Sequence, residues 1–176
     1  MAKVSAQVSQ AKGQAVFLCD VSPPRGADPA FVEALRHLDA DFLCIAYNQG
    51  KSVRVSSAMA AALVRQQARR EVVFNLACRD MNKLALQSYL LGAHALGLQN
   101  VVVVRGDDFT DKELAAVRPV HDTTPTELVR AIKAMNEGLD YKGLRLRTPT
   151  DFCVGATLDL GKEMEREARL AQRKVA

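Results

Sequence analysis

Five short runs of apolar, largely β-branched residues recur along the chain. They span 16–21, 42–47, 72–77, 101–105 and 152–157. Each run is apolar at nearly every position, whereas a strand with one solvated face would alternate apolar and polar residues. We therefore expect five parallel strands that are buried on both faces, as strands covered by helices are.

Helical patterns fill the segments between these runs. The first has Asp28 as a candidate N-cap and a proline at the first helical position. Its apolar face comprises Phe31, Leu35 and Leu38. Ser56 or Ser57 is the candidate cap of the second. The apolar positions of the second helix are Met59 and Leu63.

The later helices have the clearest start and stop signals. One helix is expected over 82–96, and Gly97 follows it as a suitable C′ residue. The segment from Thr124 to Glu127 combines a capping box with a proline at the first helical position. A final helix is expected from about 162 to the end, where interleaved Glu and Arg can pair one turn apart.

Alternating strands and helices, without a linker or low-complexity tract, predict one α/β domain over 1–176. Either a doubly wound sheet or a (β/α)₈ barrel satisfies this alternation, and spacing alone does not choose between them. In both folds the chemistry belongs at the carboxyl ends of the strands. The residues that close each strand are therefore the candidates for a site.

Composition excludes several classes of function. The 176 residues are 48% apolar and 25% charged, with a net charge of +4 that is scattered among acidic neighbours. We therefore expect an ordinary folded protein without a nucleic-acid partner. No apolar stretch approaches the length of a membrane span, and the first residues do not resemble a signal peptide. We expect no membrane partner and a cytoplasmic location.

The cysteines do not form a metal or redox motif. Each lies within or at the end of an apolar run, and no CxxC spacing occurs. We expect all four to be buried thiols in a reducing compartment; they are Cys19, Cys44, Cys78 and Cys153. HExxH and glycine-rich nucleotide motifs are absent too, and we expect no metal.

The first strand ends with a carboxylate. Asp20 follows an apolar run and precedes the rigid turn at Pro23 and Pro24. Because Asp is unfavourable inside a strand, its presence needs a cause. It either caps backbone N–H groups of the turn or points into a pocket as a general acid.

Amide side chains and a glycine close the next two strands. The second strand leads through Ala46 and Tyr47 to Gln49 and Gly50, a loop that lets the backbone approach a ligand. An ordinary polar loop is the alternative. The third strand contains Asn75, whose buried amide needs hydrogen-bond partners.

The fourth strand end is the most informative. Four valines end at Val104 and are followed by Arg105, Gly106, Asp107 and Asp108. A cation, a conformationally free glycine and two acids thus occur together where a buried strand opens. This predicts charges of both signs at the rim of a site.

Taken in order, these strand ends resemble the methylenetetrahydrofolate reductase family. The best matching segments are 22–24, 75–80 and 96–107, each at or near the end of an expected strand. The resemblance implies an α/β fold of the (β/α)₈ TIM-barrel type, of which this chain would supply about the first five strand-helix units. It favours the barrel over the doubly wound sheet.

The resemblance also implies an activity. Family members use FAD to pass reducing equivalents from NADH or NADPH to 5,10-methylenetetrahydrofolate, a one-carbon reaction that yields 5-methyltetrahydrofolate for methionine biosynthesis. The expected activity is therefore an oxidoreductase with a folate substrate. A flavin- or pterin-binding partner protein of one-carbon metabolism, without reductase activity of its own, is the alternative.

Individual roles follow by resemblance. Asp20 takes the place of a catalytic Glu that helps to protonate the folate, and Asp107 matches a carboxylate near the flavin and folate rings. The matched flavin contacts are Ala46, Tyr47, Gln49, Asn75, Arg105, Gly106 and Asp107. Six further positions match less closely: Thr123, Thr124, Pro125, Thr157, Glu167 and Lys174.

Several positions depart from the family pattern. Asp20 is one methylene shorter than Glu, Asn75 replaces a His, and Ala46 replaces a Thr. A (β/α)₈ barrel needs about 250 residues. We therefore expect the chain to be part of a longer protein, with a natural half barrel as the alternative. In the intact protein we expect a homo-oligomer or a partner subunit.

Overall fold

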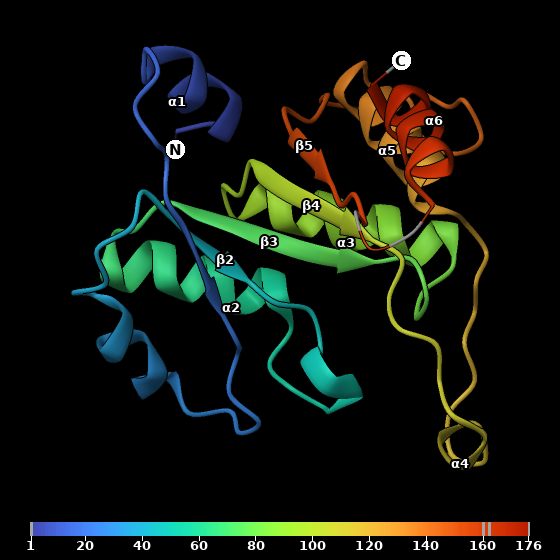
Figure 1. Cartoon of the computed structure of the whole chain (residues 1–176), viewed down its shortest axis with the longest axis horizontal. Coiled ribbons are helices and arrows are strands. Elements are labelled where there is room, and N and C mark those ends of the chain that lie inside the picture. Colours follow the sequence, from blue (N-terminus) through green and yellow to red (C-terminus); the bar gives the residue numbers. More distant parts are fainter. Residues whose placement is uncertain (1, 160, 162, 176) are drawn as a thin grey trace.

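A five-stranded, entirely parallel sheet forms the centre of the computed structural model, which describes residues 2–159, 161 and 163–175 (Figure 1). Its strands are β1 (Leu18–Val21), β2 (Phe42–Ile45), β3 (Val72–Ala77), β4 (Asn100–Val104) and β5 (Cys153–Ala156). Their spatial order follows the sequence. A doubly wound sheet reverses its strand order, whereas a barrel does not. The α/β fold is confirmed, and the topology is consistent with part of a TIM barrel.

Helices alternate with the strands. They are α1 (Val4–Gln10), η1 (Pro29–Leu35), η2 (Gln49–Lys51), α2 (Ser57–Leu63), η3 (Val64–Ala68), α3 (Lys83–Ala95), α4 (Asp111–Leu114), α5 (Pro125–Asn136) and α6 (Met164–Val175). The η1 helix is of the 3₁₀ type, and η3 is one π-helical segment that continues α2. Among the described residues, none of these helices is long and apolar enough to cross a bilayer.

The strongest sequence signals produce the best-packed helices. Asn82 caps α3 by accepting a hydrogen bond from the Ala85 N–H, and Gly97 ends it with φ of +81°. Thr124 and Glu127 form the expected capping box of α5. The apolar faces of these helices are fully or almost fully buried against the sheet at Leu86, Leu90, Ala93, Leu128, Ile132 and Met135.

The two faces of the sheet differ. Side chains on one face of the strands, such as Leu43, Phe74 and Val103, join the buried core beneath the helices. Their neighbours along each strand point to the opposite face because strand side chains alternate. That opposite face includes Asp20 and Asn75 at its carboxyl edge.

Burial of the first strand is less than expected. We predicted a strand covered on both faces, but Phe17 is 66% exposed and Leu18 is 45% exposed. The strand pairs only with β2 among the described residues, so its other edge has no neighbouring strand there. The expectation of burial on both faces is thus wrong for β1, and also for β5, none of whose four positions is buried, although β3 is buried at five of six positions.

Two further expectations need correction. Met59 is 40% exposed because the buried face of α2 consists of alanines and Ser57 instead. Only Cys78 is buried among the four cysteines, and the other three, all free thiols, are partly exposed. The expected final helix is confirmed from Met164 to Val175, while its expected start at position 162 lies outside the described residues.

A short helix missed in the sequence lies at the amino-terminal ends of the strands (Figure 1). The buried side chain of Asn100, the first residue of β4, accepts a hydrogen bond from Val4 N–H at 3.0 Å. Its amide group also donates to the Ala2 carbonyl at 2.9 Å. This residue holds α1 at the edge of the sheet opposite to the candidate site.

Candidate functional site at the carboxyl edge of the sheet

A cavity of about 250 Å³ opens at the carboxyl ends of β1 to β4, and we call it the strand-end cavity. Its lining combines two carboxylates, several amides and two cations. The lining residues are Asp20, Ala46, Tyr47, Asn48, Gln49, Gly50, Lys51, Asn75, Ala77, Arg79, Val104, Gly106 and Asp107. The cavity therefore brings together seven of the predicted residues, which come from the ends of four different strands.

Gly106 is required by the way β4 turns into its loop. Its φ is +87°, a conformation that residues with side chains rarely adopt. A Cβ atom at this position would lie 3.0 Å from the Cβ of Arg79 and 3.4 Å from that of Ala77. The glycine thus lets the β4 loop lie directly against the end of β3.

The loop after β2 is fixed by unusual backbone geometry and by contacts to β1. Asn48, Gly50 and Lys51 all have positive φ, so the loop folds tightly over the cavity. Ser22 donates a hydrogen bond to the Gln49 side chain. These loops are tied again beyond the cavity, where the Val55 N–H donates to the Pro24 carbonyl at 3.0 Å.

A buried ion pair lies at the base of the same cavity. Arg79 binds Asp80 through two hydrogen bonds, Nε to Oδ1 at 2.5 Å and Nη2 to Oδ2 at 2.8 Å. Burial raises the pKa of Tyr47, and the charge of Asp80 and a hydrogen bond to it raise that pKa further. The Tyr47 hydroxyl is thus held neutral, as a donor rather than a proton source.

The floor of the cavity pairs a thiol with an amide. The Cys44 thiol donates to Oδ1 of Asn75 at 3.7 Å, and Cys44 lies opposite Asp20 in the strand register. Burial, and then the charge of Asp20, raise the pKa of Cys44 to about 11. Cys44 is therefore a protonated packing group here, not a nucleophile. Asp20 itself is exposed.

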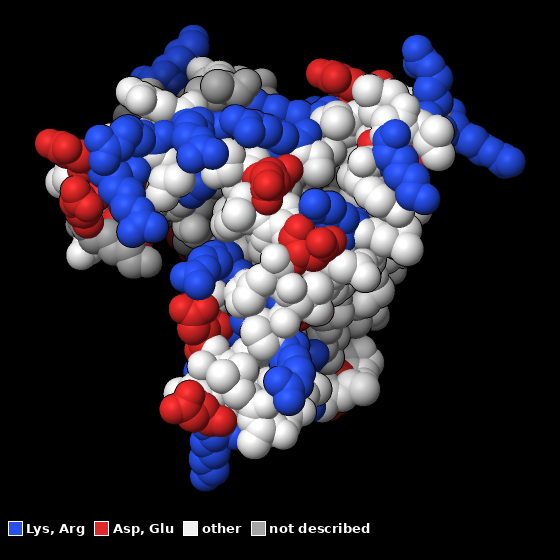
Figure 2. Space-filling view, turned by 90° about the vertical axis from the view of Figure 1, so that its right-hand side faces the viewer, with Lys and Arg blue, Asp and Glu red and all other residues white. Residues whose placement is uncertain are grey.

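A second cavity of about 720 Å³ adjoins the first, and we call it the helix-side cavity. It lies between the β4 loop, the start of α5 and α6. Four cations line it: Arg105, Arg166, Arg173 and Lys174. Figure 2 shows Lys and Arg side chains gathered over the upper part of this side of the molecule, where α5 and α6 lie. Both cavities share Val104, Gly106 and Asp107.

Ion pairs and hydrogen bonds hold parts of the helix-side cavity in place. Arg105 pairs with Asp108 at 2.8 Å, with both side chains mostly exposed. Lys174 donates to the Thr157 carbonyl at 2.7 Å. The buried carboxylate of Glu167 accepts a hydrogen bond from the Asp159 N–H at 3.3 Å. Glu167 thereby shapes the end of the loop that precedes α6.

The predicted residues thus divide between the two cavities. Arg105, Thr124, Pro125, Thr157, Glu167 and Lys174 line the helix-side cavity, and the remaining predicted residues except Thr123 line the strand-end cavity. Thr123 is buried and lines a separate pocket between α3 and α5. The structure therefore does not bring Thr123 together with the others.

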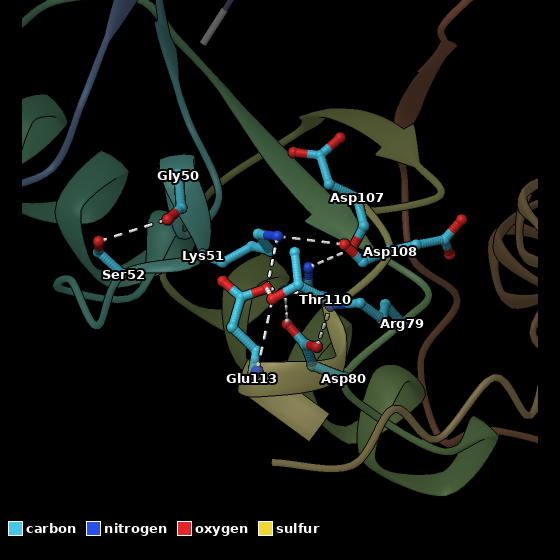
Figure 3. A network of polar contacts seen from close by, with 9 residues as sticks. All are labelled: Gly50, Lys51, Ser52, Arg79, Asp80, Asp107, Asp108, Thr110 and Glu113. Carbon is cyan, nitrogen blue, oxygen red and sulfur yellow. Dashed lines mark hydrogen bonds and ion pairs between the residues drawn. The ribbon is translucent and has the colours of Figure 1, made fainter. Parts of the chain in front are cut away.

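Sequence reasoning missed Arg79, Lys51 and Asn48. Lys51 bridges two loops, because its Nζ lies 2.6 Å from Glu113 Oε2 and 3.2 Å from the Asp108 carbonyl (Figure 3). This hydrogen bond and those from Thr110 lower the pKa of Glu113 to about 2. The sequence signal for Arg79 was an Arg-Asp pair directly after a buried strand.

A parallel sheet in barrel order, with polar and charged groups gathered at its carboxyl edge, defines the class of α/β barrel enzymes. Comparison with protein families identifies the family within this class. The family model described as "Methylenetetrahydrofolate reductase" matches residues 4–144, most of the chain. The chain belongs to the methylenetetrahydrofolate reductase family. Comparison with individual curated proteins gave no match. Membership indicates a reductase-type oxidoreductase of one-carbon folate metabolism.

Proposed function

We propose that the protein binds FAD across the two cavities and takes part in reducing 5,10-methylenetetrahydrofolate to 5-methyltetrahydrofolate, with NADH or NADPH as electron donor. One observation supports this above the others. Asp20 and Asp107 lie with amide side chains in a cavity at the carboxyl edge, and a cation-lined cavity continues from it. Family membership supports the same reaction class.

The chain's own residues fit a dinucleotide flavin. The ring of a flavin presents amide-like edges, which Gln49, Asn75 and backbone groups of the strand-end cavity can bind. Its pyrophosphate is anionic, and the helix-side cavity supplies Arg105 and Lys174. Gly106, shared by both cavities, lets the loop after β4 lie directly against the end of β3, where a Cβ would lie 3.0 Å from that of Arg79. The chemistry that these residues would hold in place is hydride transfer, which a bound flavin would supply between the nicotinamide cofactor and the folate.

The protein groups would control protons and charge on the folate. Asp20, at the end of β1, would donate a proton to the folate, so that a C–N bond of the methylene bridge breaks and leaves an iminium cation. The carboxylate of Asp107 would stabilise that cation electrostatically. Hydride addition to the iminium carbon would then give the methyl group and neutralise the positive charge of the iminium.

A second function is favoured by two observations. Asp20 is exposed and short, and Asn75 cannot titrate where the family has a His. A flavin-binding partner protein without reductase activity would tolerate both features. Binding of flavin would then persist although the folate reaction is absent.

Two measurements test these proposals. Titration of the purified protein with FAD should shift the flavin absorbance and quench its fluorescence, and an absence of any shift would contradict both functions. Anaerobic mixing of the flavin-reduced protein with 5,10-methylenetetrahydrofolate should then reoxidise the flavin. Flavin binding without reoxidation would instead support the partner protein.

A further inference from the structure

Arg79 is an unusual residue to line a cavity because its charge is almost completely buried. Its exposed fraction is 4%, so the guanidinium is shielded from solvent. Asp80 neutralises the guanidinium with the two hydrogen bonds described above, and these raise the pKa of Arg79. A buried charge is costly unless it is paired and hydrogen-bonded, so this arrangement needs a purpose.

The remaining nitrogen of the guanidinium contacts the loop that follows β4. Nη1 of Arg79 donates to the main-chain carbonyl of Asp107 at 2.6 Å. Figure 3 shows the Asp107 carboxylate pointing away from Arg79. Arg79 thus holds the backbone of Asp107 while leaving its carboxylate unpaired by this cation, as a group that must act on a ligand requires.

The same residue holds both ends of the long β4–α5 loop. The Arg79 guanidinium lies 4.1 Å from the centre of the Phe109 ring, just after Asp107. Its main-chain carbonyl accepts a hydrogen bond from the Val120 N–H at 2.7 Å, where the loop returns. Gly106, before both of these contacts in the chain, lies so near Arg79 that an added Cβ would be 3.0 Å from the Arg79 Cβ.

Through Asp80 the arrangement also reaches β2. Asp80 is the charge and hydrogen-bond partner that helps to raise the pKa of the Tyr47 hydroxyl. The ion pair that follows β3 therefore acts on candidate groups after both neighbouring strands, through the hydrogen bond to Asp107 and through the charge of Asp80 near Tyr47.

We propose that Arg79 is a positioning residue, which with Asp80 sets where Asp107 and Tyr47 lie relative to a bound flavin and folate. This inference rests on the proposed function for its catalytic consequence. The placement of the loop by Arg79 does not depend on the proposed function. Loop placement and the catalytic consequence can therefore be tested separately.

Loop placement is tested by limited trypsin cleavage, without any ligand. Arg79→Met should increase cleavage after Lys112 and Arg118 about tenfold, because the loop opens more often. Arg70→Met is the matched control: Arg70 also donates to main-chain carbonyls, at 2.6 Å to Ala40 and 3.0 Å to Arg36, but at the other end of the strands. Equal cleavage in the two variants would overturn the placement.

The catalytic part of the proposal is tested by a double-mutant cycle with Asp107→Asn in the flavin-loaded protein. Arg79→Met should slow the folate half-reaction on the order of 100-fold in the native background, since small misplacements have such effects. In the Asp107→Asn background it should have almost no further effect. Independent, multiplicative effects would contradict positioning.

Two further variants complete the test. Arg79→Lys should not restore the rate, because one ammonium cannot bind Asp80 and the carbonyl as the planar guanidinium does, and full recovery would overturn the proposal. If Arg79→Met does not fold, Asp80→Asn replaces it in the same experiments. It should increase loop cleavage and slow the folate half-reaction by smaller factors, and an unchanged rate would contradict the proposal. If the native protein shows no folate reaction, the proposed function fails, while the cleavage result still decides the placement.

Discussion

The two cavities share Gly106 and Asp107 but are built on different principles. The strand-end cavity is lined by residues from four strand ends, which are fixed by sheet pairing, positive-φ turns and the buried Arg79–Asp80 pair. The helix-side cavity depends on side chains of α6, whose described contacts to the loop before it are single hydrogen bonds. Rigid geometry suits a reacting ring, whereas mobile cations suffice for a phosphate.

The largest expected effect separates chemistry from binding within the strand-end cavity. Asp20→Asn should slow the folate half-reaction about 10²- to 10⁴-fold, because the amide has a similar shape but cannot supply a proton. FAD affinity and nicotinamide oxidation should change little. The measurement is stopped-flow absorbance of each half-reaction.

Asp20→Glu is the matched variant, since it restores the side chain usual in the family and should keep or raise the rate. If Asp20→Asn retains full folate turnover, the acid lies elsewhere and the partner-protein function gains support.

The next effect should damage both cavities at once. Gly106→Ala places a Cβ 3.0 Å from Arg79 in a residue with φ of +87°. We expect a loss of about 1–3 kcal/mol in the free energy of unfolding, measured by urea denaturation. Gly26→Ala is the control, because nothing lies within 4 Å of its added Cβ. Equal stability of the two variants would show that the β4 turn can rearrange.

A smaller effect should distinguish the cavities by ligand. Replacing Arg105 and Lys174 together by Gln should weaken FAD binding by about 1.5–3 kcal/mol, since hydrogen bonds to charged groups have this magnitude. Binding of riboflavin, which has no phosphate, should be unchanged. Both affinities can be measured by fluorescence titration, and an equal loss for riboflavin would place the ring, not the phosphates, beside α6.

Segments with a clear burial pattern or strong helix signals could be predicted from the sequence, whereas the exposure of β1 and the shortest helices could not. The apolar run at 72–77 predicts β3 correctly because burial of both faces leaves no polar position. The outer strand β1 looks the same in sequence, yet no described strand covers its free edge. Short helices such as α4 have too few residues for periodicity, although the capping box from Thr110 to Glu113 was present.

From the residue pattern alone, the candidate site was predictable where its residues follow directly on a strand, and the positions on α5 and α6 came only from the family resemblance. Asp20 and Asp107 could be found because an acid after an apolar run is conspicuous. Lys51 could not, because its role depends on Glu113, 62 positions away, and on a turn of positive-φ residues that no periodicity reveals. Thr123 lines a different pocket from its neighbour Thr124, because the boundary between a loop and a helix decides which way each side chain faces.

The smallest effect tests whether Asp20 lies next to the floor of the strand-end cavity. The charge of Asp20 raises the pKa of Cys44, although less than burial does. In Asp20→Asn that pKa should fall, so more thiolate exists at pH 8 and alkylation by iodoacetamide should be faster, by less than about tenfold for a shift below one pKa unit. Cys78 is the internal control, because burial and the charge of Glu127 raise its pKa to about 12 without any contribution from Asp20. Peptide mass spectrometry measures both rates in one sample. A Cys44 rate that does not change relative to Cys78 would mean that Asp20 points away from the cavity, toward the turn it would then merely cap.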